Sequence, residues 1–571
     1  MRRTKGLAAL ATGVALALAG CTTSNVGGAD PTASAGVVEP GGGIATGEGE
    51  LFEVNATPRA ELDQGGTLRR AVGPLPEQWN PLHVGGANAA YSDVFAPISV
   101  ANWDFDGAGV PTPNENFLLG FDDDMVGEQE VVVLHLNPDA VWNSGKPITW
   151  QDYAATVSAC NGSNAEFQCA TGAFAAVQSV EQGDTPFDVV VTFSAAFPDW
   201  KAALSTVLPA DGVADPATFN EGWLEHPADW ATGPFAVEST DAAQQVLTLV
   251  PNERWWGPAP ILDEIQYRVV SPEGTALAFQ NGELDVFDVG ADPNAFQIAS
   301  AVPGADVRRA GSTSWRNITF NSSAGALTEL AVRQAIVRSL DRSVIAASSL
   351  AGLPAELQRP LDNHIFLEGQ EGYEDNAADY GYDPVGARAA LDAAGWTPDP
   401  RTGIRERDGE PLVVRFSVLT GVPVSENEGQ LVQAQLREVG IDVELDQVPE
   451  AKFGETLFSG DFELMGMYWY GSPYPMVGLG EIYGDPATAH SNFARVASPE
   501  LDEVIAKIAT ETDHEARLEL ADQADELIWA EAHTLPLYQR PQLVAAVSDL
   551  ANVGATGLSS TRPENWGFVA G

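Results

Sequence analysis

The sequence predicts an α/β fold, and three observations lead to this prediction. Two short runs rich in β-branched residues, at 130–136 and 245–250, have the composition of strands. Segment 329–340 places apolar residues four positions apart, as an amphipathic helix does. Helical and strand-like segments then alternate toward the C-terminus, which is typical of a sheet covered on both faces. The 571 residues exceed what one core comfortably fills, so two or three domains are expected.

Helix start and stop signals support the helical segments of this prediction. Asp and Ser are good N-caps, Pro is favoured at the first helical position, and Gly ends helices. The signals are Asp341 before and Gly352 after one helix, Asp383-Pro384 before and Gly395 after a second, Gly440 between a third and a following strand, and Ser498-Pro499 before a fourth.

The composition is strongly acidic. Asp and Glu number 80 against 29 Lys and Arg, which gives a formal charge of −51. Nucleic-acid binding depends on Lys and Arg clusters that neutralise phosphates, so this charge excludes a nucleic acid as partner. The same charge disfavours direct adsorption to anionic lipid.

The N-terminus has the anatomy of a signal peptide. Arg2, Arg3 and Lys5 precede an apolar stretch at 7–18, which is too short to span a bilayer. The stretch ends in Leu-Ala-Gly-Cys at Cys21, which resembles the lipobox of bacterial lipoproteins. The resemblance implies a signal peptide over 1–20, lipidation of Cys21 and anchoring to the outer face of the cell membrane. The alternative is a chance cysteine beside an ordinary cleavage site.

Residues 21–65 are rich in Gly, Ala, Thr, Ser and Pro and poor in large apolar side chains, so we expect a flexible tether. No later segment is apolar enough to cross a membrane. Cys160 and Cys169 close a loop of about ten residues, and an oxidising exterior favours a disulfide between them over two free thiols.

Searches for catalytic motifs find none. The sequence lacks HExxH, SxxK, GxSxG and a phosphate-binding loop, so no catalytic residue, metal or cofactor is predicted. A secreted hydrolase with dispersed catalytic residues remains an alternative. Asn102, Asp104, Asp106 and Gly107 have the spacing of a calcium loop, but Pro113 stands where a bidentate Glu is required. The interpretation adopted is a hairpin with Asp-Gly at its turn.

Several segments, in order along the chain, resemble the family 5 extracellular solute-binding proteins of ABC importers, which include oligopeptide, dipeptide and nickel receptors. The resemblance covers about residues 66–545. The matching segments are VLHLNPDAVWNSGKPITWQDYAATV (133–157), TGPFAVES…LTLVPNERWWG (232–257), FQNGELDV (279–286), ITFNSSAGALTELAVRQAIVRSLDR (318–342), and the later YDPVGARAALDAAGW, VGIDVEL, SPELD and TLPLY.

This resemblance implies a two-lobed, periplasmic-binding-protein-like type II fold with three domains, in which the first lobe is discontinuous. The lobes would close over a ligand about hinge strands. The implied ranges are about 66–315 plus 533–571 for the first lobe, with a small domain at about 109–234 that holds both cysteines, about 316–532 for the second lobe, and 313–321 and 530–540 for the hinge strands.

The stretch GMYWYGSPYP (466–475) is the predicted ligand contact. Its Gly and Pro residues indicate an aromatic platform on a loop rather than a buried helix or central strand. In family members an aromatic-x-x-Asp element lines the cleft, and the acid pairs with the α-amino group of a peptide. Here Trp469 takes the aromatic position, but Ser472 replaces the acid and cannot neutralise an amine. The predicted site is Tyr468, Trp469, Tyr470, Gly471, Ser472 and Tyr474, with Trp79, Asn80, Trp315 and Asn321 on other cleft edges. The alternative is that two or three of the aromatic residues of 466–475 only pack between the lobes.

The predicted function follows from these points. We expect a non-enzymatic, monomeric, lipid-anchored substrate-binding protein of an ABC importer, which captures extracellular peptides or a similar solute and delivers them to the permease. With its WNPLH element at 79–83 and its cysteine-containing insertion, the sequence also resembles certain actinobacterial lipoproteins of cell-envelope glycolipid assembly. A role in such assembly is therefore the second interpretation.

Overall fold

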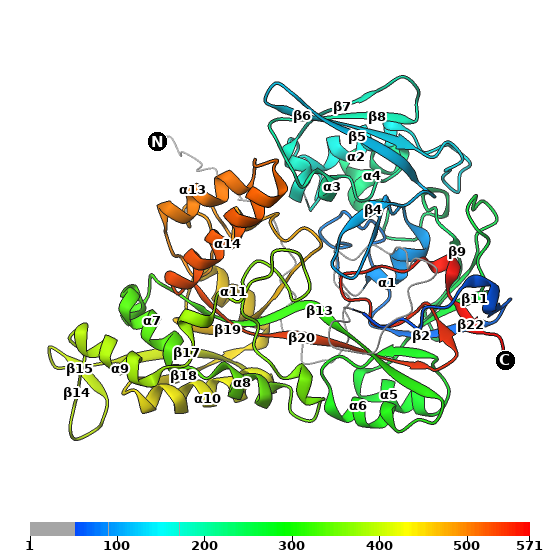
Figure 1. The fold of residues 1–571 in the computed structure, drawn as a ribbon. Helices are drawn as coiled ribbons and strands as arrows, with labels where there is room; N and C mark the ends of the chain where they lie inside the picture. Colours follow the sequence, from blue (N-terminus) through cyan, green and yellow to red (C-terminus); the bar gives the residue numbers. More distant parts are fainter. Residues whose placement is uncertain (1–51, 89–90, 171) are drawn as a thin grey trace, which may run out of the picture.

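The computed structural model describes residues 52–571, except 89, 90 and 171 (Figure 1). The predicted signal peptide, Cys21 and most of the predicted tether lie outside the described residues. Within the described part of the chain, no helix is both long and apolar enough to cross a membrane.

The predicted C-terminal end of the tether is wrong. Glu53 exchanges two backbone hydrogen bonds of 2.9 Å with Ala555, and Val54 is fully buried. Strand β1 (Leu62–Asp63) pairs with β22 (Gly567–Val569), which also pairs with β21 (Leu550–Ala551). The folded body therefore already includes residues 52–65. Their partners lie about 500 residues later in the sequence, so local composition gave no sign of this pairing.

A ten-stranded mixed sheet extends through the molecule (Figure 1). In spatial order, the strands are β18 (Asp442–Pro449), β17 (Val413–Thr420), β19 (Leu464–Tyr470), β13 (Ala305–Phe320), β20 (Thr534–Val547), β12 (Val286–Asp288), β2 (Thr67–Val72), β11 (Glu264–Val269), β10 (Val246–Pro251) and β9 (Phe235–Asp241). The strand-like runs 130–136 and 245–250 are confirmed as strands, the first of them in a separate sheet.

Two long antiparallel strands join the two ends of this sheet. At one end β13 pairs with β19, and at the other end β20 pairs with β12. The register between β13 and β20 shifts between Gly311 and Trp315, so the ribbon is irregular midway. Figure 1 shows β13 and β20 crossing from one half of the molecule to the other. They include most of both predicted hinge segments.

The smaller domain has a sheet of its own, with spatial order β5-β6-β8-β7. Helix α2 packs against this sheet and ends at Cys160, which forms a disulfide with Cys169. The Asp152 carboxylate accepts a 2.9 Å hydrogen bond from the Thr149 backbone and so caps α2. The elements of this domain are β5 (Leu118–Val126), β6 (Gln129–Leu136), α2 (Trp150–Cys160), β7 (Val177–Gln182), β8 (Asp188–Phe193), α3 (Trp200–Ala203) and α4 (Pro216–Glu221).

Helices cover the large sheet, and the predicted start signals act as expected at two of them. Asp341 and Asp383 each accept backbone hydrogen bonds at the N-termini of α8 and α9. Gly440 has a φ of +88°, which explains why the helix preceding it ends there. The helices are α1 (Ser92–Phe95), α5 (Pro272–Gln280), α6 (Pro293–Ser300), α7 (Leu330–Ser339), α8 (Arg342–Ser349), α9 (Pro384–Ala393), α10 (Pro423–Glu438), α11 (Phe453–Ser459), α12 (Leu479–Tyr483), α13 (Pro499–Ile508) and α14 (His514–Ala530).

The segment with calcium-loop spacing is a hairpin, as predicted. Strand β3 (Trp103–Phe105) pairs with β4 (Pro111–Pro113), and Asp106 Oδ1 accepts 2.9 Å hydrogen bonds from Ala108 N and Val110 N. Asp104 is buried against Arg562 instead of facing the loop. The remaining short strands, β14 (Thr397–Pro398), β15 (Arg405–Arg407) and β16 (Glu410–Pro411), form a sheet beside α9.

Candidate functional site

The aromatic stretch 466–475 begins inside a strand and ends in a loop. Residues up to Tyr470 belong to β19, which lies between β17 and β13, so this part is a central strand and not the predicted loop. Gly471 then ends the strand with a backbone N–H that donates to Thr313 O at 2.8 Å. Since side chains alternate along a strand, Trp469 faces the opposite side of the sheet from Tyr468 and Tyr470.

Trp469 lies on the buried side. It is directly opposite Trp315 on β13, and the exposed fractions of these two residues are 8% and 5%. The Trp469 ring stacks on Phe493 with a centroid distance of 5.9 Å and an interplanar angle of 17°. Both tryptophans belong to an apolar cluster with Leu367 and Met467. This burial and stacking favour packing roles for both, which for Trp469 is the alternative interpretation; that either residue contacts the ligand stays a prediction.

Tyr468 and Tyr470 lie on the other side and are half-buried. The Arg316 guanidinium carbon lies 4.7 Å from the centroid of the Tyr468 ring, and the Tyr468 and Tyr538 hydroxyl oxygens are 3.5 Å apart. Arg316 is itself fully buried and donates to both carboxylate oxygens of Glu428, with a shortest distance of 2.6 Å. This ion pair fixes Arg316 under the ring, so Tyr468 is held in one orientation.

The loop after β19 contacts the first lobe. Tyr474 packs edge-on against Phe105 at a centroid distance of 6.0 Å, and Pro473 lies next to Gly109. Burial raises the pKa of the Tyr474 hydroxyl well above its usual value. Ser472 is also engaged, because its hydroxyl accepts a 3.1 Å hydrogen bond from Tyr474 N. These contacts make 472–474 a packing segment between the lobes.

The two predicted asparagines have structural roles. Asn80 is fully buried, donates to Phe219 O at 3.1 Å and accepts from Leu82 N at 2.9 Å. Asn321 is 1% exposed and donates to the backbone carbonyls of Gly460 and Phe462. Their amides are used in fixing local backbone, which favours a structural role for both; that they line the cleft stays a prediction.

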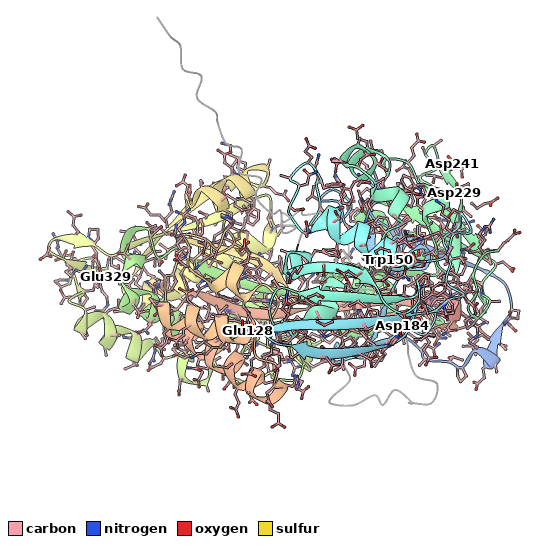
Figure 2. The ribbon with its side chains drawn as sticks, turned by 90° about the horizontal axis from the view of Figure 1, so that it is seen from above. Glu128, Trp150, Asp184, Asp229, Asp241 and Glu329 are labelled. Carbon is pink, nitrogen blue, oxygen red and sulfur yellow. A yellow bond between two sulfur atoms is a disulfide. The ribbon has the colours of Figure 1, made fainter. Side chains whose placement is uncertain are left out.

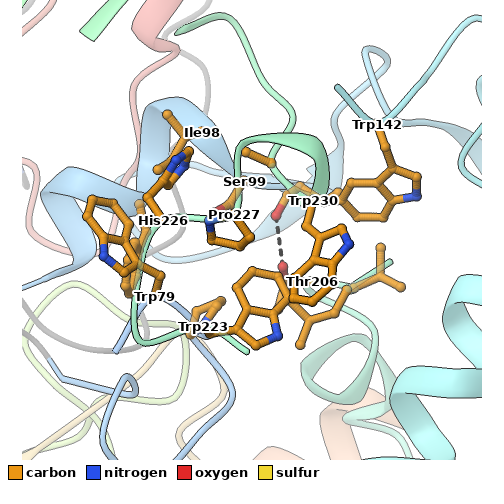
Figure 3. A pocket seen from close by; sticks show the side chains of 15 residues that line it. Trp79, Ile98, Ser99, Trp142, Thr206, Trp223, His226, Pro227 and Trp230 are labelled. Atoms are coloured by element: carbon orange, nitrogen blue, oxygen red, sulfur yellow. Dashed lines mark hydrogen bonds between the residues drawn. The ribbon is translucent and has the colours of Figure 1, made fainter. Parts of the chain in front are cut away.

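Trp79 belongs to a separate group of aromatic side chains within the first lobe. Its ring meets His226 edge-on at 4.7 Å, and both line a cavity of about 30 Å³ together with Trp142, Trp223 and Trp230 (Figure 3). Burial lowers the pKa of His226 to about 4, so the imidazole is neutral at physiological pH. The cavity has room for roughly one water molecule. We therefore do not assign Trp79 to a peptide site.

Two charged residues that the sequence analysis did not single out lie close to each other, and one of them, Arg540, is within electrostatic range of Tyr468. Asp288 ends β12 and Arg540 lies on β20, and both side chains are half-buried. Arg540 is two positions after Tyr538, so both point to the same face of the sheet. The sequence signal for Arg540 was a single charged residue in β20, whose other residues are uncharged.

A buried ion pair joins the second lobe to the small domain. Arg517 on α14 donates to both carboxylate oxygens of Asp199, which directly precedes α3, with Nη1 and Oδ1 3.0 Å apart. Arg517 and Asp199 are 5% and 9% exposed, and Arg517 Nε donates to Ile508 O at 2.9 Å. This bidentate pair and the Tyr474 contact hold the lobes against each other in this structure.

Several acidic side chains are exposed, among them Glu128, Asp184, Asp229 and Asp241. Figure 2 shows Glu128 and Asp184 well apart from each other and from Asp229 and Asp241. Among the residues that the structure describes, no three His, Cys, Asp or Glu side chains form a group that could hold a metal ion.

Known proteins with similar sequences identify the family. Residues 126–491 match the bacterial extracellular solute-binding proteins, family 5 (middle part). The chain belongs to this family. The oligopeptide-binding protein OppA of Mycobacterium tuberculosis is 36% identical over 532 residues, which cover 91% of this chain and 88% of OppA.

Two further proteins are similar to the chain. The solved structure of the periplasmic EDTA-binding protein EppA has a TM-score of 0.83 and 27% sequence identity, and covers 92% of this chain and 100% of EppA. LpqW of Mycobacterium tuberculosis, named a probable monoacyl phosphatidylinositol tetramannoside-binding protein, is 27% identical over 309 residues, or 51% of this chain and 45% of LpqW. The predicted α/β type II fold and the binding, non-enzymatic role in an ABC importer are thus confirmed.

Proposed function

We propose that this chain is the lipid-anchored receptor of an ABC importer for peptides. It works outside the cytoplasm, binds a peptide between its lobes and delivers it to the permease in the membrane. The observation that carries the peptide assignment is the 36% identity to an oligopeptide-binding protein over 91% of the chain. An alignment of this extent includes both lobes and the strands that join them.

The fold supports capture by closure. Among the strands of residues 52–571 that the structure describes, β13 and β20 alone continue the large sheet from one lobe into the other, and their register shifts between Gly311 and Trp315. A two-stranded ribbon with an irregular middle resists bending less than a wide regular sheet does. A ligand that contacts both lobes then favours the closed arrangement by its extra contacts there, and the permease recognises that arrangement.

The surface proposed to meet the ligand is smaller than the sequence indicated. It retains Tyr468 and Tyr470, whose half-buried rings and hydroxyls suit peptide backbone and side chains. We do not include Trp469, Trp315, Asn80 or the other buried residues in this proposed ligand surface. The missing acid at Ser472 is not replaced within the 466–475 stretch, which contains no Asp or Glu.

Native mass spectrometry of protein that starts after Cys21 and is purified without refolding tests this proposal. Comparing the native with the denatured mass, and identifying what dissociates, should yield a set of peptides. Calorimetric titration with short synthetic peptides should then give saturable binding. Protein that carries a non-peptide solute, and that binds no peptide after the solute is removed, would contradict the proposal.

A second candidate function is glycolipid binding in cell-envelope assembly. The match to LpqW, a protein named for a tetramannoside lipid, favours it, although this match spans about half of each chain. Release of a mannosylated lipid in the same mass-spectrometric experiment would support this function. The absence of permease and ATPase genes beside the coding gene would support it independently.

The lipid anchor is the part of the proposal that rests on sequence alone. Two or three acyl chains on Cys21 would give stable attachment, because each buried methylene contributes about 0.8 kcal/mol. Cells grown with an alkyne-labelled fatty acid should incorporate the label into the wild-type protein. A Cys21→Ala variant should remain unlabelled and move to the medium, and retention of that variant on the membrane would refute the anchor.

A further inference from the structure

The Arg540 side chain lacks the partners that half-buried arginines usually have. Among the described residues, its guanidinium makes no hydrogen bond and no ion pair. Other arginines of the protein are well satisfied: Arg316 binds Glu428, and Arg308 donates to the carbonyls of Val553 and Leu550. A guanidinium has five N–H donors and is always charged, so an unpaired one in a half-buried place is suited to an anion.

The backbone near Arg540 leaves room for this guanidinium. Gly290 has a φ of +59°, and a Cβ atom placed on it would lie 3.0 Å from Arg540 Nη2. Any larger residue at 290 would therefore be strained and would press on the guanidinium. The glycine lets the charged end of Arg540 lie close to the main chain that follows β12.

Asp288 lies beside the same glycine. Its Oδ1 accepts a 2.6 Å hydrogen bond from Gly290 N and lies 3.9 Å from the same Cβ position. The Cβ position on Gly290 is therefore 3.9 Å from Asp288 Oδ1 and 3.0 Å from Arg540 Nη2. The distance between Asp288 Oδ1 and Arg540 Nη2 cannot exceed the sum of these two values. Yet the two side chains form no ion pair in the described structure. An acid and a base are thus held near each other without forming an ion pair.

The electrostatics agree with this geometry. Burial raises the pKa of Asp288, and the positive charge of Arg540 opposes that rise. For Arg540, burial lowers the pKa, but Tyr468 and Asp288 raise it and give an upward shift overall. Tyr470 and Tyr538 contribute in the same direction. The guanidinium is therefore within electrostatic range of both the acid and the two tyrosines on β19.

The elements that meet here belong to both lobes. Asp288 ends β12 of the first lobe, Tyr468 and Tyr470 belong to β19 of the second, and Arg540 lies on the connecting strand β20. Two opposite charges that are partly desolvated but not paired are unfavourable in the empty protein. A ligand that brings an ammonium to the acid and a carboxylate to the base would satisfy both charges.

We propose that Arg540 and Asp288 form the charged recognition site for a zwitterionic ligand, in which Arg540 binds a carboxylate and Asp288 binds an ammonium group. This inference rests on the proposed function, and it names the ionic groups that the ligand carries. It supplies from the first lobe the acid that the second-lobe stretch lacks at Ser472. The adjacent rings of Tyr468 and Tyr470 would then contact the uncharged part of the ligand.

Calorimetric titration with alanine peptides of two to five residues tests the proposal. Each peptide is used with free ends, with an acetylated N-terminus and with an amidated C-terminus. Asp288→Asn keeps the acceptor for Gly290 N, and Arg540→Gln removes the charge. Matched controls are Arg401→Gln and Asp122→Asn, whose side chains are 82% and 72% exposed.

The expected result is charge-specific. Arg540→Gln should weaken binding of free-acid peptides about 10- to 100-fold, the usual effect of losing one charge-assisted hydrogen-bonded pair, and should leave the amidated peptides unchanged. Asp288→Asn should weaken binding of free-amine peptides by a similar factor and leave the acetylated ones unchanged. A purely structural role for either residue would instead weaken binding of all forms equally. Melting temperatures should match those of the controls.

Three other outcomes overturn the inference, and they are distinguishable. If the wild-type protein binds these peptides and both variants bind them equally well, the charged site is refuted while the peptide function stands. If only Arg540→Gln shows the charge-specific loss, the site binds an anion and not a zwitterion. If the wild-type protein binds none of the peptides, the proposed peptide function fails, and this inference fails with it.

Discussion

Replacing Trp469 by alanine distinguishes a packing residue from a ligand contact. The structure predicts a large loss of stability, because the Trp469 side chain is 8% exposed and stacks on Phe493. Removing about 150 Å² of buried apolar surface at 25 cal/mol per Å² lowers the free energy of unfolding by about 4 kcal/mol. The lost stacking adds about 1 kcal/mol.

One contribution acts in the opposite direction. Trp469 Nε1 is buried and has no hydrogen-bond partner among the described residues. Deleting an unsatisfied buried N–H recovers about 1–2 kcal/mol. The net expectation for Trp469→Ala is therefore a loss of about 3–4 kcal/mol, in the range typical of large-to-small core substitutions. Trp469→Phe keeps most of the apolar surface and removes the unsatisfied N–H, so its free energy of unfolding should change by about 1 kcal/mol or less.

Urea unfolding followed by circular dichroism measures both variants, and peptide titration under fully folding conditions measures binding. Trp469→Ala should shift the unfolding midpoint to much lower urea, while Trp469→Phe should unfold near the wild type. Both folded variants should retain affinity within a few fold. An unchanged urea midpoint for Trp469→Ala, together with a loss of peptide binding, would refute the assignment of Trp469 to the core and restore it to the ligand site.

Three further predictions follow from the structure. Arg517→Met leaves Asp199 buried without its partner and should lower the free energy of unfolding by about 3–5 kcal/mol. Adding Asp199→Leu to this variant should recover most of the loss. Equal urea midpoints for the wild type and the single variant would show that the pair does not form. Burial lowers the pKa of His533 to about 3, with His364 and Arg333 adding to the effect. The neutral His533 side chain therefore contributes to the free energy of unfolding above pH 6.5, and this contribution is lost as the pH falls toward 3, by about 1.4 kcal/mol per pH unit. The urea midpoint of His533→Gln should accordingly fall less steeply with decreasing pH than that of the wild type. Limited proteolysis of protein that starts after Cys21 should remove residues only up to about Phe52, and stable cleavage products starting near residue 65 would restore the longer tether.

Much of the fold was predictable from short sequence patterns. The Asp341 and Asp383 caps and the Gly440 stop are local signals whose partners lie within a few residues, and all three appear in the structure. The pairing of β1 with β22 is the opposite case. Nothing near Leu62 shows that a strand some 500 residues later will cover it, so composition alone classed that segment with the tether.

The candidate site was predicted less well, for a related reason. The aromatic stretch was found because four of its ten residues are aromatic, but composition does not show which of them face the core. That depends on the register of β19 against β13, which places Trp469 opposite Trp315 and Tyr468 opposite Arg316. Alternation along the strand then divides the stretch between two environments. The Gly and Pro residues correctly marked where the strand ends, but they did not exclude a central strand before that point.

The position of Arg540 gives the charged site a consequence for closure. Arg540 lies on β20 next to Pro541, which pairs with Gly311 where the ribbon between the lobes is irregular. A carboxylate bound there, with its ammonium on Asp288 and its body against Tyr468, would contact the connecting strand and both lobes at once. Such a ligand stabilises the closed arrangement through contacts that an open one lacks. On this argument, ligands that lack either end group should bind more weakly and also favour closure less, because each loses a contact that only the closed lobes complete.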